Sequence, residues 1–176
     1  MSKFLRVVFL TGLLATSFRV TAQEADKLKR SSPPDSISQT VNGTLLSVNY
    51  SSPSLRGRVM GVSVEPFIGK VWRAGANEAT IFAASKNVSV EGHPLPAGKY
   101  ALFMLHNPDD SWTIIFNRNW NMWGTLYEKN MDQDQLHVTV QPGKSAQYRE
   151  KLGYTLSPSG EVSLEWGWDK ISFQVH

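Results

Sequence analysis

The chain has 176 residues, of which 41% are hydrophobic and 19% charged, so it is long enough for one globular domain and too short for two ordinary ones. It contains no cysteine, which excludes disulfides, thiolate catalysis and cysteine-bound zinc or iron–sulfur centres. The formal net charge of +3 resides in Lys3, Arg6 and Arg19: removing these three from the 18 basic residues leaves 15, which equals the number of acidic residues. A neutral domain has no electrostatic footprint for nucleic acid, and we expect no nucleic-acid partner.

Residues 1–22 have the pattern of a signal peptide. Two basic residues precede the apolar run 7–18, which is about 12 residues long and therefore too short to span a bilayer. Small residues in Val20-Thr21-Ala22 suit a cleavage site that leaves Gln23 at the new N-terminus. The alternative is an N-terminal anchor helix, but Arg19 interrupts the end of the run. We expect an exported protein, periplasmic or secreted, without membrane insertion after signal cleavage.

The mature chain is expected to begin with a flexible lead-in and to continue as one domain over residues 35–176. The lead-in, residues 23–34, is polar and ends in two serines and two prolines. Asn42-Gly43 then lies between the alternating segments 38–41 and 44–50, which is a strong signal for a two-residue hairpin turn.

Short alternating segments separated by turn residues recur to the end of the chain. No segment has a long apolar stripe at helical spacing. About eight or nine short strands with frequent turns predict an all-β fold, a single antiparallel β-sandwich that is jelly-roll-like. After the hairpin, the expected strands are 79–84, 87–90, 99–106, 111–117, 136–141, 150–156, 161–166 and 170–175.

Two stretches do not follow the strand pattern. Residues 53–78 show only weak alternation, and residues 119–134 are rich in Trp, Asn and Asp. Long irregular stretches in a compact domain are often functional, or else they are packed on themselves.

Several motifs along the chain resemble the domain of unknown function 2911 family, whose members are mostly exported proteins of Bacteroidetes-type bacteria. The likeness covers roughly residues 34–176, and its longest motif is Trp72-Arg73-Ala74-Gly75-Ala76-Asn77-Glu78-Ala79-Thr80. The resemblance supports the fold and the compartment and implies no activity. Ser52 and Ala74 stand where the family usually has arginine and threonine, so a ligand contact made by that arginine in relatives would be missing here. The other matching motifs are 50–58, 69–71, 95–100, 111–117, 123–124, 165–166 and 171–173.

Polar residues crowd the irregular stretch 53–78 and predict a binding site. The backbone N–H groups of the turn Gly75-Ala76-Asn77 could form an anion-binding nest, and the planar forks of arginine suit carboxylate, phosphate or sugar-acid groups. Trp72 and Trp123 could offer stacking faces to a sugar or an aromatic ring. The predicted ligand-binding residues are Arg56, Arg58, Trp72, Arg73, Asn77, Glu78 and Trp123.

The same residues also fit a purely structural interpretation. Arg73 and Glu78 could pair with each other, and Asn77 could bond to loop backbone and hold the long stretch in place. Trp120 and Trp123 could form an exposed aromatic loop, which would favour carbohydrate or partner binding, or they could fold over an open end of the core. Trp112 is expected in the core, and of Trp166 and Trp168 one is expected to face inward and the other outward.

Signals for an enzyme are weak. The four histidines form no metal-binding motif, although His93, His106 and Glu91 could meet across strands, and we expect neither a metal nor a cofactor. Glu78 is the sole candidate for a general base. The leading hypothesis is an exported binding module for a small polar or anionic ligand, such as a glycan or cell-wall fragment. The alternatives are a structural or partner-binding module of the cell envelope and, third, a hydrolase or isomerase that uses Glu78; homo-oligomerisation by edge strands is open.

Overall fold

The computed structural model describes residues 26–176, and the predicted signal peptide with its cleavage site lies outside this range. Strands dominate, as the sequence predicts, and no helix in the described part of the chain is long and apolar enough to cross a membrane. The elements are β1 (Pro34–Val41), β2 (Thr44–Ser51), β3 (Val71–Trp72), β4 (Thr80–Ala84), β5 (Val88–Val90), β6 (His93–Leu95), β7 (Gly98–His106), β8 (Trp112–Asn117), the 3₁₀ helices η1 (Gly124–Lys129) and η2 (Met131–Gln133), β9 (Asp134–Val140), β10 (Gly143–Leu156) and β11 (Glu161–Gln174).

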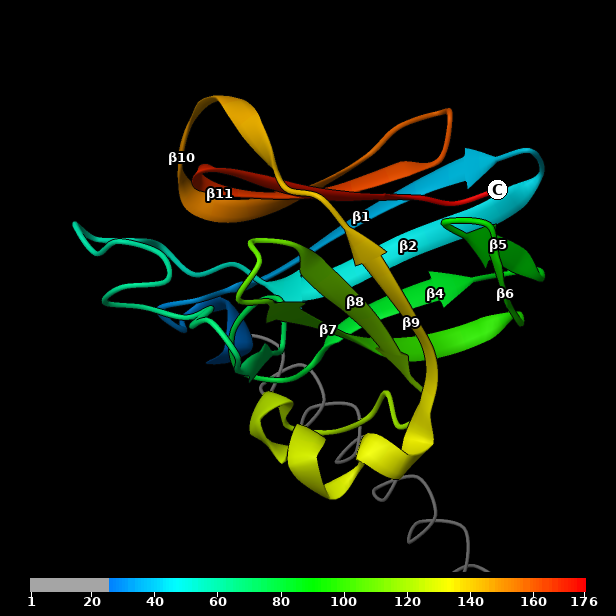
Figure 1. Cartoon of the computed structure of the whole chain (residues 1–176), viewed down its shortest axis with the longest axis horizontal. Helices are drawn as coiled ribbons and strands as arrows, with labels where there is room; N and C mark the ends of the chain where they lie inside the picture. The colour runs from blue at the N-terminus through cyan, green and yellow to red at the C-terminus, as the bar shows by residue number, and fades with distance from the viewer. Residues whose placement is uncertain (1–25) are drawn as a thin grey trace, which may run out of the picture.

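The strands form a sandwich-like arrangement of antiparallel sheets. The large sheet has the order β1-β2-β4-β7-β8-β9, with β3 paired to the end of β7. The hairpin β10–β11 covers one face of this sheet, and η1 and η2 lie on the opposite side (Figure 1). A second short hairpin, β5–β6, completes the fold.

The predicted hairpin at Asn42-Gly43 is confirmed. β1 and β2 pair without a register shift from Pro34 opposite Ser51 to Val41 opposite Thr44. Asn42 and Gly43 have φ values of 48° and 74°, which is the conformation that a type I′ turn requires and that these two residue types tolerate best.

The main core lies between the large sheet and the β10–β11 hairpin. Phe116 on β8 contacts Phe82 and Phe173 edge-on, with ring centroids 5.3 and 5.6 Å apart, and so joins the two layers. The other face of β7 and β8 is also apolar, and Met122 and Tyr127 from the irregular segment 119–134 cover it. Both faces of β7 and β8 are therefore buried, which explains why these two strands read as continuous apolar runs.

Differences from the expected strands occur where local sequence signals are short or interrupted. Segments 161–166 and 170–175 belong to one strand, β11, because Gly167 adopts φ 62° and lets the strand continue through an irregular register. Trp166 points into the core and Trp168 is 57% exposed, as the sequence predicts for this pair. Strands β3 and β6 are only two and three residues long and carry no alternation that could have revealed them.

Segment 119–134 is held in place by hydrogen bonds that converge on Asp134. The carboxylate accepts from the Tyr127 hydroxyl at 2.7 Å and from Asn117 Nδ2 at 2.7 Å, and His137 Nε2 lies 2.8 Å from it. Burial, together with the hydrogen bond to Asp134, raises the pKa of Tyr127 well above its usual value of 10. The segment therefore folds over the outer face of the large sheet rather than over an open end of the core, and Trp120 and Trp123 stay partly exposed.

Replacing Asp134 by asparagine is expected to lower the free energy of unfolding by about 1–3 kcal/mol. One acceptor oxygen becomes an NH₂ group, so at least one of the surrounding donors is left without a partner. Urea unfolding would measure the change. Asp132→Asn is the control, because Asp132 is exposed and, among residues 26–176, its side chain accepts only from its neighbour Gln133; an equal loss in both variants would contradict the role assigned to Asp134.

Candidate functional site

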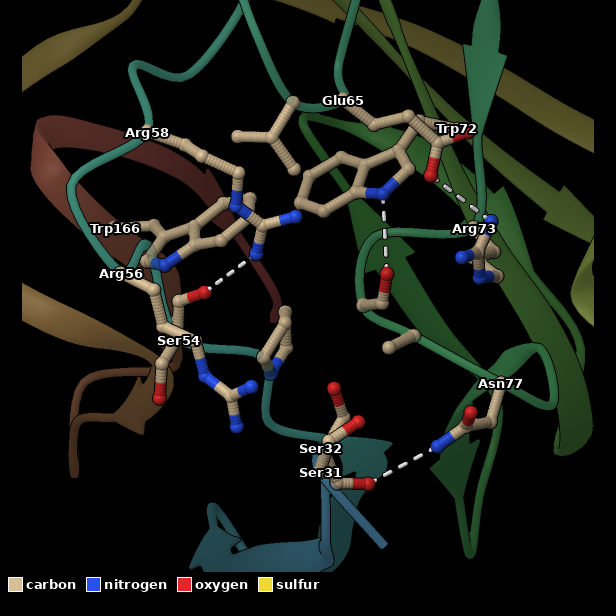
Figure 2. Close-up of a pocket in the computed structure, with 14 residues that line it drawn as sticks. Ser31, Ser32, Ser54, Arg56, Arg58, Glu65, Trp72, Arg73, Asn77 and Trp166 are labelled. Carbon is tan, nitrogen blue, oxygen red and sulfur yellow. Dashed lines mark hydrogen bonds and ion pairs between the residues drawn. The ribbon is translucent and has the colours of Figure 1, made fainter.

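A cavity of about 600 Å³ opens where three segments of the chain meet. The loop after β2, the residues after β3 and the end of the lead-in form its walls, and Trp166 of β11 contributes from behind (Figure 2). We call it the arginine cavity because Arg56, Arg58 and Arg73 line it, together with one carboxylate, Glu65.

Arg56 and Arg58 flank a sharp turn that aims both side chains at the cavity. Arg56 and Gly57 have φ values of 51° and 74°, and the Arg56 backbone N–H donates to the Glu150 carboxylate at 2.7 Å. The Arg58 guanidinium donates to two backbone carbonyls, from Nε to Leu55 O at 2.8 Å and from Nη2 to Ser54 O at 2.7 Å. These neutral acceptors orient Arg58 without cancelling its charge.

Arg73 approaches from the opposite wall. Its Nη1 donates to Glu65 Oε2 at 3.0 Å, while its Nε is buried without a hydrogen-bond partner among the described residues. The pairing of Arg73 with Glu78 that the sequence left open is therefore wrong: Glu65, from the loop before β3, takes that place. The aliphatic part of Arg73 passes over Gly124, where a Cβ atom would overlap Arg73 Cδ.

Asn77 closes the lower wall of the cavity in Figure 2. Its Nδ2 donates to Ser32 O at 3.0 Å, which ties the lead-in to the residues after β3. The nest predicted over Gly75-Ala76-Asn77 is not open throughout, because the Ala76 N–H already donates to Ser51 O at 3.2 Å.

Left-handed backbone is concentrated around this cavity. Arg56, Ala74 and Asn77 have φ values of 51°, 51° and 61°. The other non-glycine residues with positive φ in the described range, Asn42, Glu91 and Asp110, all lie in tight turns between paired strands. The left-handed conformation costs about 1–2 kcal/mol for a residue such as Arg56 or Ala74 and less for Asn77, and such strain gathers at functional sites.

Trp72 forms a wall of the cavity rather than an open platform. It is only 2% exposed, its ring lies nearly parallel to that of Trp166 at 6.0 Å, and its indole N–H donates to Gly75 O at 3.1 Å. A ring that is covered in this way offers little area for stacking.

Glu78 and Trp123 line a different cavity, of about 390 Å³. Arg30 of the lead-in reaches both carboxylate oxygens of Glu78 at 2.9 Å. Burial raises the pKa of Glu78, but the hydrogen bond and charge of Arg30, with the charge of Lys27, outweigh it and leave the pKa below its usual 4.5. A general base at neutral pH would need a raised pKa, so the geometry does not favour a hydrolase or isomerase built on Glu78.

The lead-in contributes residues that sequence reasoning did not select. Ser31 and Ser32 line the arginine cavity and Arg30 pairs with Glu78, although residues 23–34 were expected to be a flexible lead-in. A polar stretch with two prolines has no local signal for such contacts, because their partners lie more than 40 residues away. Glu65 lies only eight residues before its partner Arg73, and it was missed because the irregular stretch 53–78 has no periodic pattern that indicates which of its charged residues meet.

The two departures from the family pattern lie beside the cavity and not in it. Ser52 is buried and its hydroxyl donates to Leu152 O at 2.7 Å. Ala74 is buried, and its carbonyl accepts from Thr80 Oγ1 at 3.0 Å and from the Tyr154 hydroxyl at 2.8 Å.

Within residues 26–176 no three His, Cys, Asp or Glu side chains are grouped to hold a metal ion. His106 pairs with Asp110 and not with His93.

Comparison with known proteins yields one family. A family model described as "Protein of unknown function (DUF2911)" matches residues 32–176, which is most of the chain and includes every residue of the arginine cavity except Ser31. Neither the curated proteins nor the solved structures give a significant match.

Proposed function

We propose that this chain, which belongs to the DUF2911 family of proteins of unknown function, is an exported binding module for a small anionic ligand, such as a sugar acid or a cell-wall fragment. The observation that carries the proposal is the convergence of three arginines on one cavity that has, within the described part of the chain, a single carboxylate. Three positive charges against one negative charge leave the lining with a formal charge of +2.

The state of the three guanidinium groups supports an anionic ligand. Arg73 shares its charge with Glu65, Arg58 is oriented by neutral carbonyls, and the Arg56 side chain has no hydrogen-bond partner among the described residues. Guanidinium groups bind carboxylate and phosphate oxygens in pairs, and these charge-assisted hydrogen bonds are about twice as strong as neutral ones. A volume of about 600 Å³ is in the range of small-molecule sites.

The Arg56→Ala variant is expected to bind small anions about tenfold or more weakly, because losing a hydrogen bond to a charged group costs about 1.5–3 kcal/mol. The fold should be unaffected, since the side chain is exposed. Isothermal titration calorimetry with glucuronate, muramyl dipeptide and inorganic phosphate would measure it. Arg118→Ala is the control, as Arg118 is exposed and does not line the cavity. Absence of binding to all three probes, or an equal loss in the control, would contradict the proposal.

A structural or partner-binding module of the cell envelope is the second candidate. Its support is that all three side chains bond within the protein: Arg58 holds the turn of its own loop, Arg73 joins the loop after β2 to the residues after β3, and Asn77 joins those residues to the lead-in. If this is their role, Arg58→Ala will lower the melting temperature, and none of the three anions will raise it.

A further inference from the structure

The cavity that contains Glu78 and Trp123 is separate from the arginine cavity and differs from it in chemistry. It lies on the outer face of the large sheet, between the lead-in, strands β2 and β4, and residues 120–123. We call it the aromatic cavity. Its two tryptophans, Trp120 and Trp123, are 37% and 47% exposed.

The position of Trp123 follows from a short antiparallel pairing. Glu78 forms a bridge with Trp123, flanked by hydrogen bonds from Ala79 N to Met122 O and from Gly124 N to Asn77 O, both 3.1 Å. Directly opposed residues in an antiparallel pair present their side chains on the same side, about 5 Å apart at Cβ. The indole of Trp123 and the carboxylate of Glu78 are therefore neighbours in the cavity. Met122 packs with the apolar side chains on the outer face of β7 and β8.

The two tryptophans differ in what covers them. Lys99 Nζ lies 4.8 Å from the centre of the Trp120 ring, which occupies one of its faces. No aromatic ring or cation stacks on Trp123 among the described residues. An apolar ring that stays half-exposed beside a cavity, on a backbone fixed by the bridge to Glu78, is a preformed platform.

The polar groups around this platform can both donate and accept hydrogen bonds. Arg30 Nη1 donates to both oxygens of the Glu78 carboxylate, and Lys27 Nζ lies 4.0 Å from the same group, so the carboxylate is neutralised and these three residues carry a formal charge of +1. The side chains of Asn49 and Asn121 also line the cavity and have no hydrogen-bond partner among the described residues.

From this arrangement we infer that the aromatic cavity binds a neutral carbohydrate chain. A pyranose ring has a face of C–H bonds, which packs on an indole ring, and a rim of hydroxyl groups, which need adjacent donors and acceptors. Trp123 offers the face, and the paired Arg30 and Glu78 with the two asparagine amides offer the rim. The inference does not depend on an anion in the arginine cavity, because the two sites use different residues.

The experiment is a titration of the purified protein with maltotetraose, cellotetraose, mannotetraose and the tetramer of N-acetylglucosamine, followed by tryptophan fluorescence. We expect a saturable change with at least one of these neutral sugars. Trp123→Ala is expected to weaken that binding about tenfold or more, since buried tryptophan contacts dominate binding energies. Asn121→Ala, which leaves the aromatic platform intact, should weaken it as well.

Matched variants make the result specific. Trp168 is 57% exposed and lies outside both cavities, so Trp168→Ala should leave sugar binding unchanged. Arg56→Ala should also leave it unchanged, which separates this site from the anion site. No saturable change with any of the four sugars, or equal weakening by Trp123→Ala and Trp168→Ala, would overturn the inference.

Discussion

Replacing Phe116 by alanine is expected to lower the free energy of unfolding by about 3–5 kcal/mol. Phe116 is fully buried, and its ring meets Phe82 of the large sheet and Phe173 of β11 edge-on. Truncation would remove apolar contacts from both layers and leave a cavity between them, because neither sheet can collapse onto the other without breaking its own hydrogen bonds. Since domains are commonly stable by about 5–15 kcal/mol, the loss is a large part of the total.

Urea unfolding, followed by circular dichroism, would measure this loss. The control is Ile68→Ala, which truncates a side chain of similar chemistry that is 58% exposed and should change the stability by about 0.5 kcal/mol or less. A loss below about 1 kcal/mol for Phe116→Ala would contradict the packing of β10–β11 on the large sheet.

Replacing Gly124 by alanine is expected to displace Arg73, to lower the free energy of unfolding by about 1–3 kcal/mol and to weaken anion binding. A Cβ atom at Gly124 would overlap Arg73 Cδ and lie 2.8 Å from Arg73 Cβ. Gly124 is also tied to Asn77 by a backbone hydrogen bond, so it cannot move away without disturbing the wall of the arginine cavity. Urea unfolding and calorimetry with the three anions would measure both effects.

Two comparisons identify the cause of the Gly124→Ala effect. Gly153→Ala is the matched control, because a Cβ atom there meets nothing within 4 Å, and its stability should be unchanged or slightly higher. In the double variant with Arg73→Ala, most of the overlap is removed. The double variant should therefore lose less free energy of unfolding than the two single variants lose in total. Full additivity would show that Arg73 does not pass over Gly124.

The arginine cavity was predictable in part. Arg56, Arg58, Arg73 and Asn77 all lie in one irregular stretch, and a chain that reverses within such a stretch brings its polar residues close together. Trp72 belongs to the same cavity but is covered by Trp166, which lies almost 100 residues further along the chain.

The separation of Glu78 and Trp123 from the arginines could not be predicted. Glu78 follows Asn77 directly, yet the two residues line different cavities, because the bridge to Trp123 turns Glu78 toward the outer face of the sheet. That bridge joins segments more than 40 residues apart, and no local pattern encodes it.

By itself, the sequence determined the class of fold, the strongest hairpin and the stretch that carries the arginine cavity. These features depend on local rules: side chains alternate along a strand, and Asn-Gly tolerates the left-handed turn that joins β1 and β2. Only the tertiary structure decided the partner of each charged group, with Arg73 bound to Glu65 and Glu78 bound to Arg30. An ion pair needs two side chains a few ångströms apart. For Arg30 and Glu78, which are 48 residues apart, the packing of the whole domain sets that distance, and for Glu65 and Arg73, which are eight residues apart, the path of an irregular loop sets it.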